Sequence, residues 1–175
     1  ATNSNDILSR FVNDGDYSLG SVVQTCSPSM DIQSASNFER YLYYLMDSEP
    51  ERTRELMEEF AAQGKIDLSG YQDQVRRDFA AYAVSEEQVV ETIRSFHQEF
   101  NYVLDPHTAV GVKAAWENQS TGIPMVCLAT AHPAKFGDVV REAIGRAPDT
   151  PEAIAGLADR EARCELMDAD KAQIA

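Results

Sequence analysis

The stretch Pro124-Met-Val-Cys-Leu-Ala-Thr-Ala-His-Pro-Ala-Lys-Phe-Gly-Asp-Val-Val140 decides the expected fold, because an apolar string leads directly into the start of a helix. The unbroken apolar run from Pro124 to Ala129 is typical of a strand that is buried on both faces of a parallel sheet. We expect a helix to follow from about residue 132 to residue 144. The junction between the strand and the helix runs from Thr130 to Lys135. Polar side chains at such a junction are either helix caps or parts of a site.

The same alternation of strand and helix precedes this stretch. The segments Phe79–Val84 and Tyr102–Leu104 predict two further strands. Ser85-Glu-Glu-Gln88 is a capping box that should begin a helix. Asp105-Pro106 supplies a cap and a first-turn proline for another helix, which should end near Asn118. The predicted fold class is therefore α/β, with a parallel sheet and crossover helices.

The amino-terminal part of the chain predicts short elements and a helical insertion. Ser21 to Thr25 has the pattern of a short strand or an extended loop, and Ser36-Asn-Phe-Glu39 is a capping box of the Ser-x-x-Glu type. The helix after this box should bury a stripe made of Phe38, Leu42 and Leu45. The charged segment from about 48 to 78 predicts a helical insertion with a solvated face, in which Pro50 lies in the first helical turn and Gly64 stops the helix.

We expect two regions along the chain. Residues 1–149 should form the body of the fold, including the insertion at about 48–78. Residues 150–175 should form a last helix and a polar tail, because Thr150-Pro-Glu152 is a helix start. The residues expected to face inward from that helix are Ile154, Leu157 and Ala158.

Composition narrows the class of protein. With 175 residues, of which 43% are apolar, the chain is long enough for one domain with a hydrophobic core. The formal net charge of -14 argues against a nucleic-acid partner, because phosphate binding uses clustered Lys and Arg. No apolar run reaches the roughly 20 residues that span a bilayer, so we expect no membrane association. Three well-separated cysteines, Cys26, Cys127 and Cys164, favour a reducing cytoplasm over a disulfide framework.

Polar residues stand at three junctions where a helix begins in the predicted fold. In open parallel sheets, ligands bind beyond the carboxyl ends of the strands, where the helix amino termini also point. Each of these residues can equally act as a helix cap or as a surface side chain. No His or Cys pair has the spacing of a metal site, so we expect no metal. The candidates for the cleft are Asn3, Asn5, Asp105, His107, Thr130, His132 and Lys135.

Five segments, in this order along the chain, resemble the carboxyl-terminal portion of threonine synthase. They are Ala1-Thr-Asn-Ser-Asn-Asp-Ile-Leu8, Ser27-Pro-Ser-Met-Asp-Ile32, Ser36-Asn-Phe-Glu-Arg40, Asp105-Pro-His-Thr-Ala-Val-Gly111 and Ala129-Thr-Ala-His-Pro-Ala-Lys-Phe136. The resemblance implies a pyridoxal 5'-phosphate (PLP) enzyme of the tryptophan-synthase-β-like fold, or fold type II. It implies the conversion of O-phospho-L-homoserine and water into L-threonine and phosphate.

The resemblance also implies that part of the enzyme is missing from this chain. In that family, the amino-terminal half carries the Schiff-base lysine and the loop that holds the cofactor phosphate. None of the four lysines here lies in the family's Ser-Phe-Lys-Asp context, so no catalytic residue is assigned to this chain. The missing amino-terminal half is therefore an expected partner, and the chain alone should be inactive. The four lysines are Lys65, Lys113, Lys135 and Lys171.

The resemblance gives Thr130 a role in holding the cofactor. In related enzymes, a serine or threonine at the end of a late strand hydrogen-bonds the pyridine nitrogen, and Thr130 is the matching residue. A hydroxyl does not hold a proton on that nitrogen as a carboxylate does, so the cofactor is a weaker electron sink. The weaker sink changes which of the competing carbanion reactions is favoured. His132 and Lys135 would then lie near the cofactor rim. The resemblance assigns no individual role to the remaining cleft candidates or to Ser27–Asp31.

Two other classes of function stay open at this point. The composition permits a self-sufficient acidic α/β domain with a binding or regulatory role. Residues 36 to 80 could instead form a helical interaction module. A freestanding domain would unfold cooperatively without a partner, whereas an interaction module would keep its partner after residues 81–175 are deleted.

Overall fold

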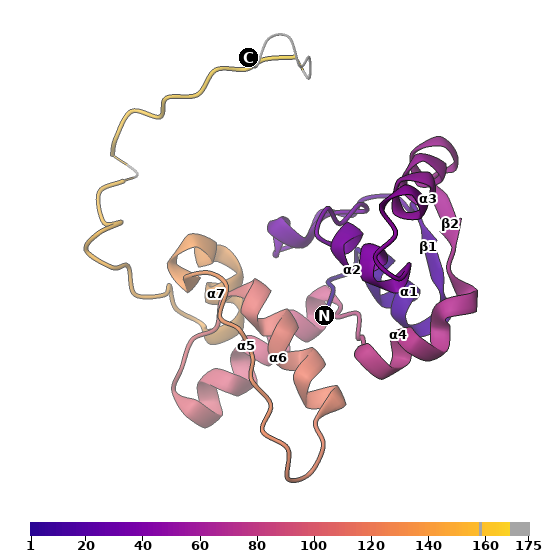
Figure 1. Ribbon diagram of the computed structural model, residues 1–175. Coiled ribbons are helices and arrows are strands. Elements are labelled where there is room, and N and C mark those ends of the chain that lie inside the picture. The colour runs from indigo at the N-terminus through magenta and orange to yellow at the C-terminus, as the bar shows by residue number, and fades with distance from the viewer. Residues whose placement is uncertain (158, 169–175) are drawn as a thin grey trace.

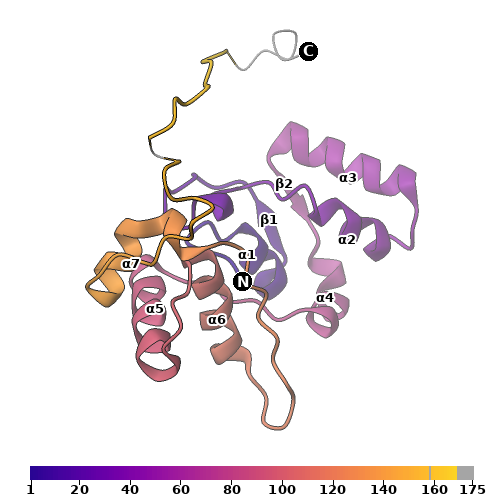
Figure 2. The ribbon, with the colours of Figure 1, turned by 90° about the vertical axis from the view of Figure 1, so that its left-hand side faces the viewer.

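The helices and strands form two lobes in a computed structural model that describes residues 1–157 and 159–168 (Figure 1). The amino-terminal lobe, residues 6–78, contains α1 to α4 and both strands, and the carboxyl-terminal lobe, residues 84–145, contains α5 to α7. Figure 2 shows the two lobes side by side, with the amino terminus between them. The elements are α1 (Ile7–Asp14), β1 (Asp16–Ser18), η1 (Pro28–Met30), α2 (Phe38–Leu45), α3 (Pro50–Gln63), β2 (Lys65–Asp67), η2 (Ser69–Tyr71), α4 (Gln72–Asp78), α5 (Glu86–Phe100), α6 (Pro106–Asn118), η3 (Pro133–Phe136) and α7 (Gly137–Ile144).

Aromatic side chains form the centre of the amino-terminal lobe. The ring of Phe38 lies 4.7 Å from that of Phe11 and 4.6 Å from that of Tyr17, and the ring of Tyr17 lies 4.8 Å from that of Phe60. Aromatic pairs at these centroid distances stabilise a core beyond the area that they bury. The antiparallel pair of β1 and β2 adds Ile66, which is opposite Tyr17. Four separate elements, α1, β1, α2 and α3, therefore meet at one aromatic cluster.

The segment predicted as a helical insertion contributes to this core. It holds α3 and α4, as expected, and α3 begins at Pro50 and ends before Gly64. Gly64 has a φ of 69°, which a residue without a Cβ adopts at little cost. The segment also contains β2, which the sequence pattern did not predict. Its residues Phe60, Ile66 and Val75 are buried in the same core as α1 and α2.

Three helices pack together in the carboxyl-terminal lobe, and local caps fix where two of them begin. Ser85 and Gln88 form the predicted capping box of α5. Asp105 caps α6 and Pro106 occupies its first turn, as predicted, and α6 ends at Asn118. The buried face of α5, with Val89 and Ile93, packs against α6 and α7.

The first residues of the chain attach to the carboxyl-terminal lobe. Thr2 forms a single parallel bridge with Ala83, in which the Thr2 N–H donates to Tyr82 at 3.1 Å and the Val84 N–H donates to Thr2 at 2.9 Å. The strand predicted at 79–84 is therefore reduced to one bridge. This bridge holds residues 1–5, which lead into α1 of the amino-terminal lobe, beside the start of α5 in the carboxyl-terminal lobe.

The predicted parallel sheet is not seen among residues 1–157 and 159–168. The sheet in this part of the chain is the antiparallel pair β1–β2, and the segments predicted as strands at 102–104 and 124–129 have no ladder. Residues 21–25, predicted as a short strand or an extended loop, have no ladder either. The prediction that 124–129 is buried on both faces is also wrong here, because the side chains of Val126 and Leu128 are each 79% exposed. A strand needs a neighbour to pair its backbone groups, and these segments have none among the residues that the structure describes.

Two predicted helix starts differ in the structure. The helix after residue 36 is present, with Phe38, Leu42 and Leu45 buried as expected, but its cap is Asn37 and no side chain caps it. Glu39 is therefore at the second helical position rather than the third, where a capping box requires it. The helix predicted from residue 132 to residue 144 is split into η3 and α7.

The last predicted helix is not formed where the structure describes it. Residues 152–156 form turns, Ile154 is half-buried, and Leu157 is 48% exposed rather than inward-facing. Ala158 lies outside the described residues. The last described segment, 161–168, has an extended path away from both lobes (Figure 1). No described helix combines the length and the apolar character needed to cross a membrane.

Candidate functional site

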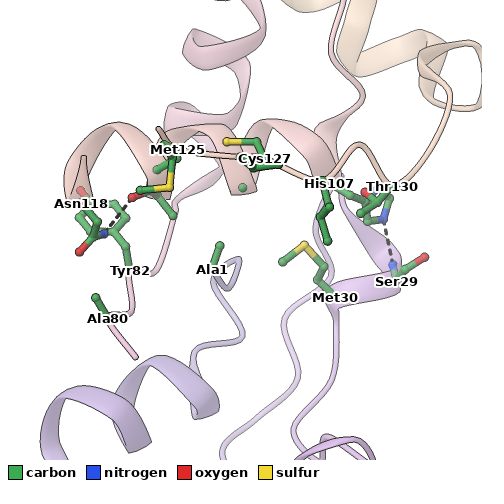
Figure 3. Close-up of a pocket in the computed structure, with 15 residues that line it drawn as sticks. Ala1, Ser29, Met30, Ala80, Tyr82, His107, Asn118, Met125, Cys127 and Thr130 are labelled. Atoms are coloured by element: carbon green, nitrogen blue, oxygen red, sulfur yellow. Dashed lines mark hydrogen bonds between the residues drawn. The ribbon is translucent and has the colours of Figure 1, made fainter. Parts of the chain in front are cut away.

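A pocket of about 780 Å³ lies where the amino-terminal segment, α6 and the segment 125–130 come together (Figure 3). The small residues Gly111, Ala114 and Ala115 form the α6 wall, so the pocket reaches the helix backbone. The apolar string that was predicted to be a strand also lines the pocket, with Met125 and Cys127 beside α6 and with Ala1 and Met30 across from them (Figure 3). The residues that line the pocket are Ala1, Ser29, Met30, Ala80, Tyr82, His107, Gly111, Ala114, Ala115, Asn118, Met125, Val126, Cys127, Leu128 and Thr130.

Thr130 lies at one end of this pocket and is exposed to it. Its backbone N–H donates a hydrogen bond to the Thr108 hydroxyl at 3.1 Å. The two hydroxyl oxygens are 3.5 Å apart, which is the outer limit of a hydrogen bond. The Thr130 hydroxyl is therefore available to a ligand, while its backbone is held by α6.

Asp105 is the polar centre of this region and is almost completely buried. Its carboxylate accepts the backbone N–H of His107 at 2.9 Å and that of Thr108 at 3.4 Å, so it caps α6. It also accepts the Thr108 hydroxyl and faces Nδ1 of His107 at 3.1 Å. Buried polar groups need such partners, and Asp105 has several.

His107 connects α6 to the loop before η1. The Ser29 N–H donates to its Nε2 at 3.2 Å, drawn as a dashed line in Figure 3. Because Nε2 accepts this bond, the imidazole is neutral and carries its proton on Nδ1, where it donates to Asp105. The ring also packs on Phe136, with the ring centroids 4.8 Å apart. His107 therefore acts as a buried connector whose ring lines the pocket.

Asn3 and Asn5 do not line the pocket and are instead buried in a polar cluster. Asp31 Oδ1 accepts from the Asn3 amide at 2.8 Å, from the Asn5 amide at 3.0 Å and from the Thr25 hydroxyl at 2.6 Å. The Asn3 amide also reaches the Ser27 hydroxyl at 3.0 Å. These bonds fix the loop that carries Ser29 against the amino terminus. The predicted cap role of Asn5 is wrong, because Asp6 occupies the cap of α1 and has no side-chain hydrogen bond there.

The charge of Asp31 is stabilised by this cluster. Burial alone would raise the pKa of its carboxyl group, but the hydrogen bonds from Thr25 and Asn3 outweigh burial and lower that pKa below the usual value. The resemblance to threonine synthase assigned no role to the segment Ser27–Asp31. The structure gives it one, because the motif closes the polar cluster and positions Ser29 for His107.

His132 and Lys135 do not line the pocket. His132 is exposed and caps η3, with its Nδ1 accepting the Ala134 N–H at 3.1 Å. Lys135 is exposed on the last turn of η3. Their predicted place at the cofactor rim remains a prediction. Of the seven candidates, Thr130 and His107 line the pocket, and Asp105 supports both of them from the interior.

The reactivity of the Cys26 thiol tests the environment beside the polar cluster of Asn3, Asn5 and Asp31. Its backbone N–H donates to Glu86 at 2.8 Å, and burial, followed by the nearby charge of Glu86, raises the pKa of its thiol to about 12. At pH 8, only about one Cys26 in ten thousand is then a thiolate, which is the reactive form. We expect iodoacetamide to alkylate the exposed Cys127 and Cys164 and to spare Cys26, as measured by peptide mass spectrometry.

Urea supplies the control for this experiment, because unfolding should make all three thiols react at similar rates. Alkylation of Cys26 as fast as Cys127 under native conditions would show that Cys26 is not in the environment described. Within the described ranges, no group of three His, Cys, Asp or Glu side chains is arranged to hold a metal ion.

Solved structures of one class of enzyme are similar to this fold. One neighbour is a PLP-bound enzyme from Brucella melitensis, which is 43% identical, has a TM-score of 0.87, and is matched over 92% of this chain and 35% of that chain. A second neighbour, from yeast, is 34% identical with a TM-score of 0.83, over 92% of this chain and 37% of that chain.

Both neighbours are threonine synthases. A family model described as "Threonine synthase, C-terminal" matches residues 108–175. The threonine synthase of Pseudomonas aeruginosa is 42% identical over 99% of this chain, which spans 38% of that relative's length. The resemblance to the carboxyl-terminal portion of threonine synthase is therefore confirmed.

Proposed function

We propose that this chain is the carboxyl-terminal part of a PLP-dependent threonine synthase. In the complete enzyme, O-phospho-L-homoserine and water would become L-threonine and phosphate. The observation that carries this proposal is the match to threonine synthases along almost the whole chain, combined with the hydroxyl of Thr130 at the end of a pocket. Because the relatives are more than twice as long, the activity belongs to the complete enzyme. The three free thiols support the predicted location in a reducing cytoplasm.

The residues of the pocket fit one side of an aromatic cofactor. Most of the lining is apolar, which suits the faces of a pyridine ring, and Thr130 supplies a neutral hydroxyl that can donate to its nitrogen. No lining residue is a lysine, so the covalent attachment must come from the missing portion. When bound, PLP supplies an electron sink for negative charge that develops on the substrate. Thr130 would hold the ring without keeping a proton on its nitrogen.

We also propose that the predicted parallel sheet forms in the complete enzyme. The segment 124–129 is extended, apolar and exposed, and such a surface on a folded protein is typical of an interface. The missing portion would pair with its backbone and cover Val126 and Leu128. The bridge between Thr2 and Ala83 would be the start of the same sheet.

The direct experiment supplies the missing portion. We expect this chain alone to bind no PLP covalently and to form no threonine. Co-expression with the amino-terminal portion of a threonine synthase should give a complex that binds PLP and releases phosphate from O-phospho-L-homoserine. The measurement is threonine formation by the purified complex.

Three further measurements separate this outcome from the alternatives. A complex in which the Schiff-base lysine of the added portion is replaced by alanine should assemble and remain inactive. Cooperative unfolding of this chain alone, with no complex formed, would instead favour a self-sufficient domain. A complex that persists after deletion of residues 81–175 would favour an interaction module on residues 36–80.

A further inference from the structure

We infer that Thr108 is a positioning residue that holds Thr130 in place for the cofactor. Thr108 belongs to the Asp105–Gly111 segment quoted from the sequence, but it is not among the seven cleft candidates and it does not line the pocket. It is 5% exposed and lies in the first turn of α6, where the cap by Asp105 fixes the backbone. This inference rests on the proposed function, because Thr130 has a role toward the cofactor only in that case.

The hydrogen-bond direction follows from the chemistry of the groups. A hydroxyl has one proton, and the proton of Thr108 is donated to the Asp105 carboxylate. The Thr108 oxygen is then an acceptor toward Thr130, and it accepts the Thr130 N–H at 3.1 Å. The Thr130 hydroxyl proton is left for a better acceptor than an oxygen 3.5 Å away. Asp105 thus orders a chain of bonds whose last free donor is the hydroxyl of Thr130.

The segment that carries Thr130 has little else to fix it. Within the part of the chain that the structure describes, the main-chain groups of residues 124–131 make one hydrogen bond, from the Thr130 N–H to Thr108. The adjoining side chains of Val126 and Leu128 are exposed. A site on an extended segment needs support from a rigid element, because a small displacement of a reacting group costs much of its effect. Helix α6 gives that support through a single hydroxyl.

A double-mutant cycle in the complete enzyme tests this inference. Thr108→Val should lower kcat per bound PLP by about tenfold, which corresponds to the loss of one hydrogen bond at the site. Thr108→Ser should restore most of the activity, because it keeps the hydroxyl. If Thr108 acts through Thr130, then Thr108→Val should cause no further loss in an enzyme that already carries Thr130→Val.

A matched control is available in the neighbouring helix. Thr92 is 3% exposed, and its hydroxyl donates to the backbone of α5 at 2.7 Å, so Thr92→Val removes a similar buried bond away from the pocket. It should leave kcat unchanged. Losses that add in the double mutant, or an unchanged kcat in Thr108→Val, would overturn the positioning role. An unchanged kcat in Thr130→Val would instead contradict the proposed function itself.

Discussion

Replacing Asp105 by alanine should lower the free energy of unfolding by about 3 kcal/mol or more. The loss of a helix cap costs roughly 0.5–2 kcal/mol, and each buried donor that loses its partner costs roughly 1–3 kcal/mol. The variant would remove the cap of α6 and would leave the Thr108 hydroxyl and the His107 ring without their shared acceptor. Urea unfolding can be followed by the fluorescence of Trp116, the single tryptophan, which lies on α6.

Ser85→Ala is the matched control for this change. Ser85 caps the neighbouring helix α5 through its hydroxyl, which accepts the backbone N–H of Gln88, but its side chain contacts no other element by a hydrogen bond. We expect a loss of about 1 kcal/mol. If Asp105→Ala is no more destabilising than Ser85→Ala, then Asp105 is a simple cap and does not hold the site together.

The helix boundaries could be predicted from the sequence because their causes are local. Ser85 with Gln88, Asp105 with Pro106, and Gly64 each act on a backbone within a few residues of themselves. Short-range hydrogen bonds and backbone preferences decide such positions. The box predicted at Ser36 was wrong for an equally local reason, since the helix begins one residue later than the box requires.

The strands were predicted from apolar runs in the sequence. Such a run indicates that a segment is buried, but it does not indicate which other segment pairs with it. Residues 124–129 have the composition of a buried strand, yet they are exposed and pair with no strand in the part of the chain that the structure describes. A parallel strand is stabilised by neighbours that are distant in sequence. This chain spans 38% of the length of a threonine synthase that it matches, and under the proposed function the neighbouring strands come from the rest of the enzyme.

The sequence predicted residues that line the pocket, but it did not predict the hydrogen bonds that support them. The position of Thr130 in a pocket agrees with the expectation from the resemblance, although its role remains a prediction. The supporting bonds from Asn3 to Asp31 and from Thr108 to Thr130 join residues 28 and 22 positions apart. Contacts over such separations depend on the tertiary fold, and no spacing rule predicts them.

Thr130→Val should lower kcat of the complete enzyme by about 10- to 100-fold and leave the folded structure intact. The change keeps the size of the side chain and removes its hydroxyl, and a lost hydrogen bond in the transition state costs roughly 1–3 kcal/mol, or about a factor of ten for each 1.4 kcal/mol. The fold should tolerate the change because the Thr130 hydroxyl is exposed and its backbone N–H still reaches Thr108. Steady-state phosphate release gives kcat, and thermal unfolding checks the fold.

Thr130→Ser supplies the control for this variant. It keeps the hydroxyl, so it should retain most of the activity that valine removes. A Thr130→Val enzyme with the wild-type kcat would show that the Thr130 hydroxyl does not contribute to the reaction.

The most direct measurement is the distance from Thr130 Oγ1 to the pyridine nitrogen in a crystal structure of the complete enzyme with PLP. We predict a hydrogen bond, at about 2.7–3.0 Å, with no carboxylate in contact with that nitrogen. A pyridine ring bound elsewhere, or a nitrogen held by an aspartate or glutamate, would contradict the role given to this chain.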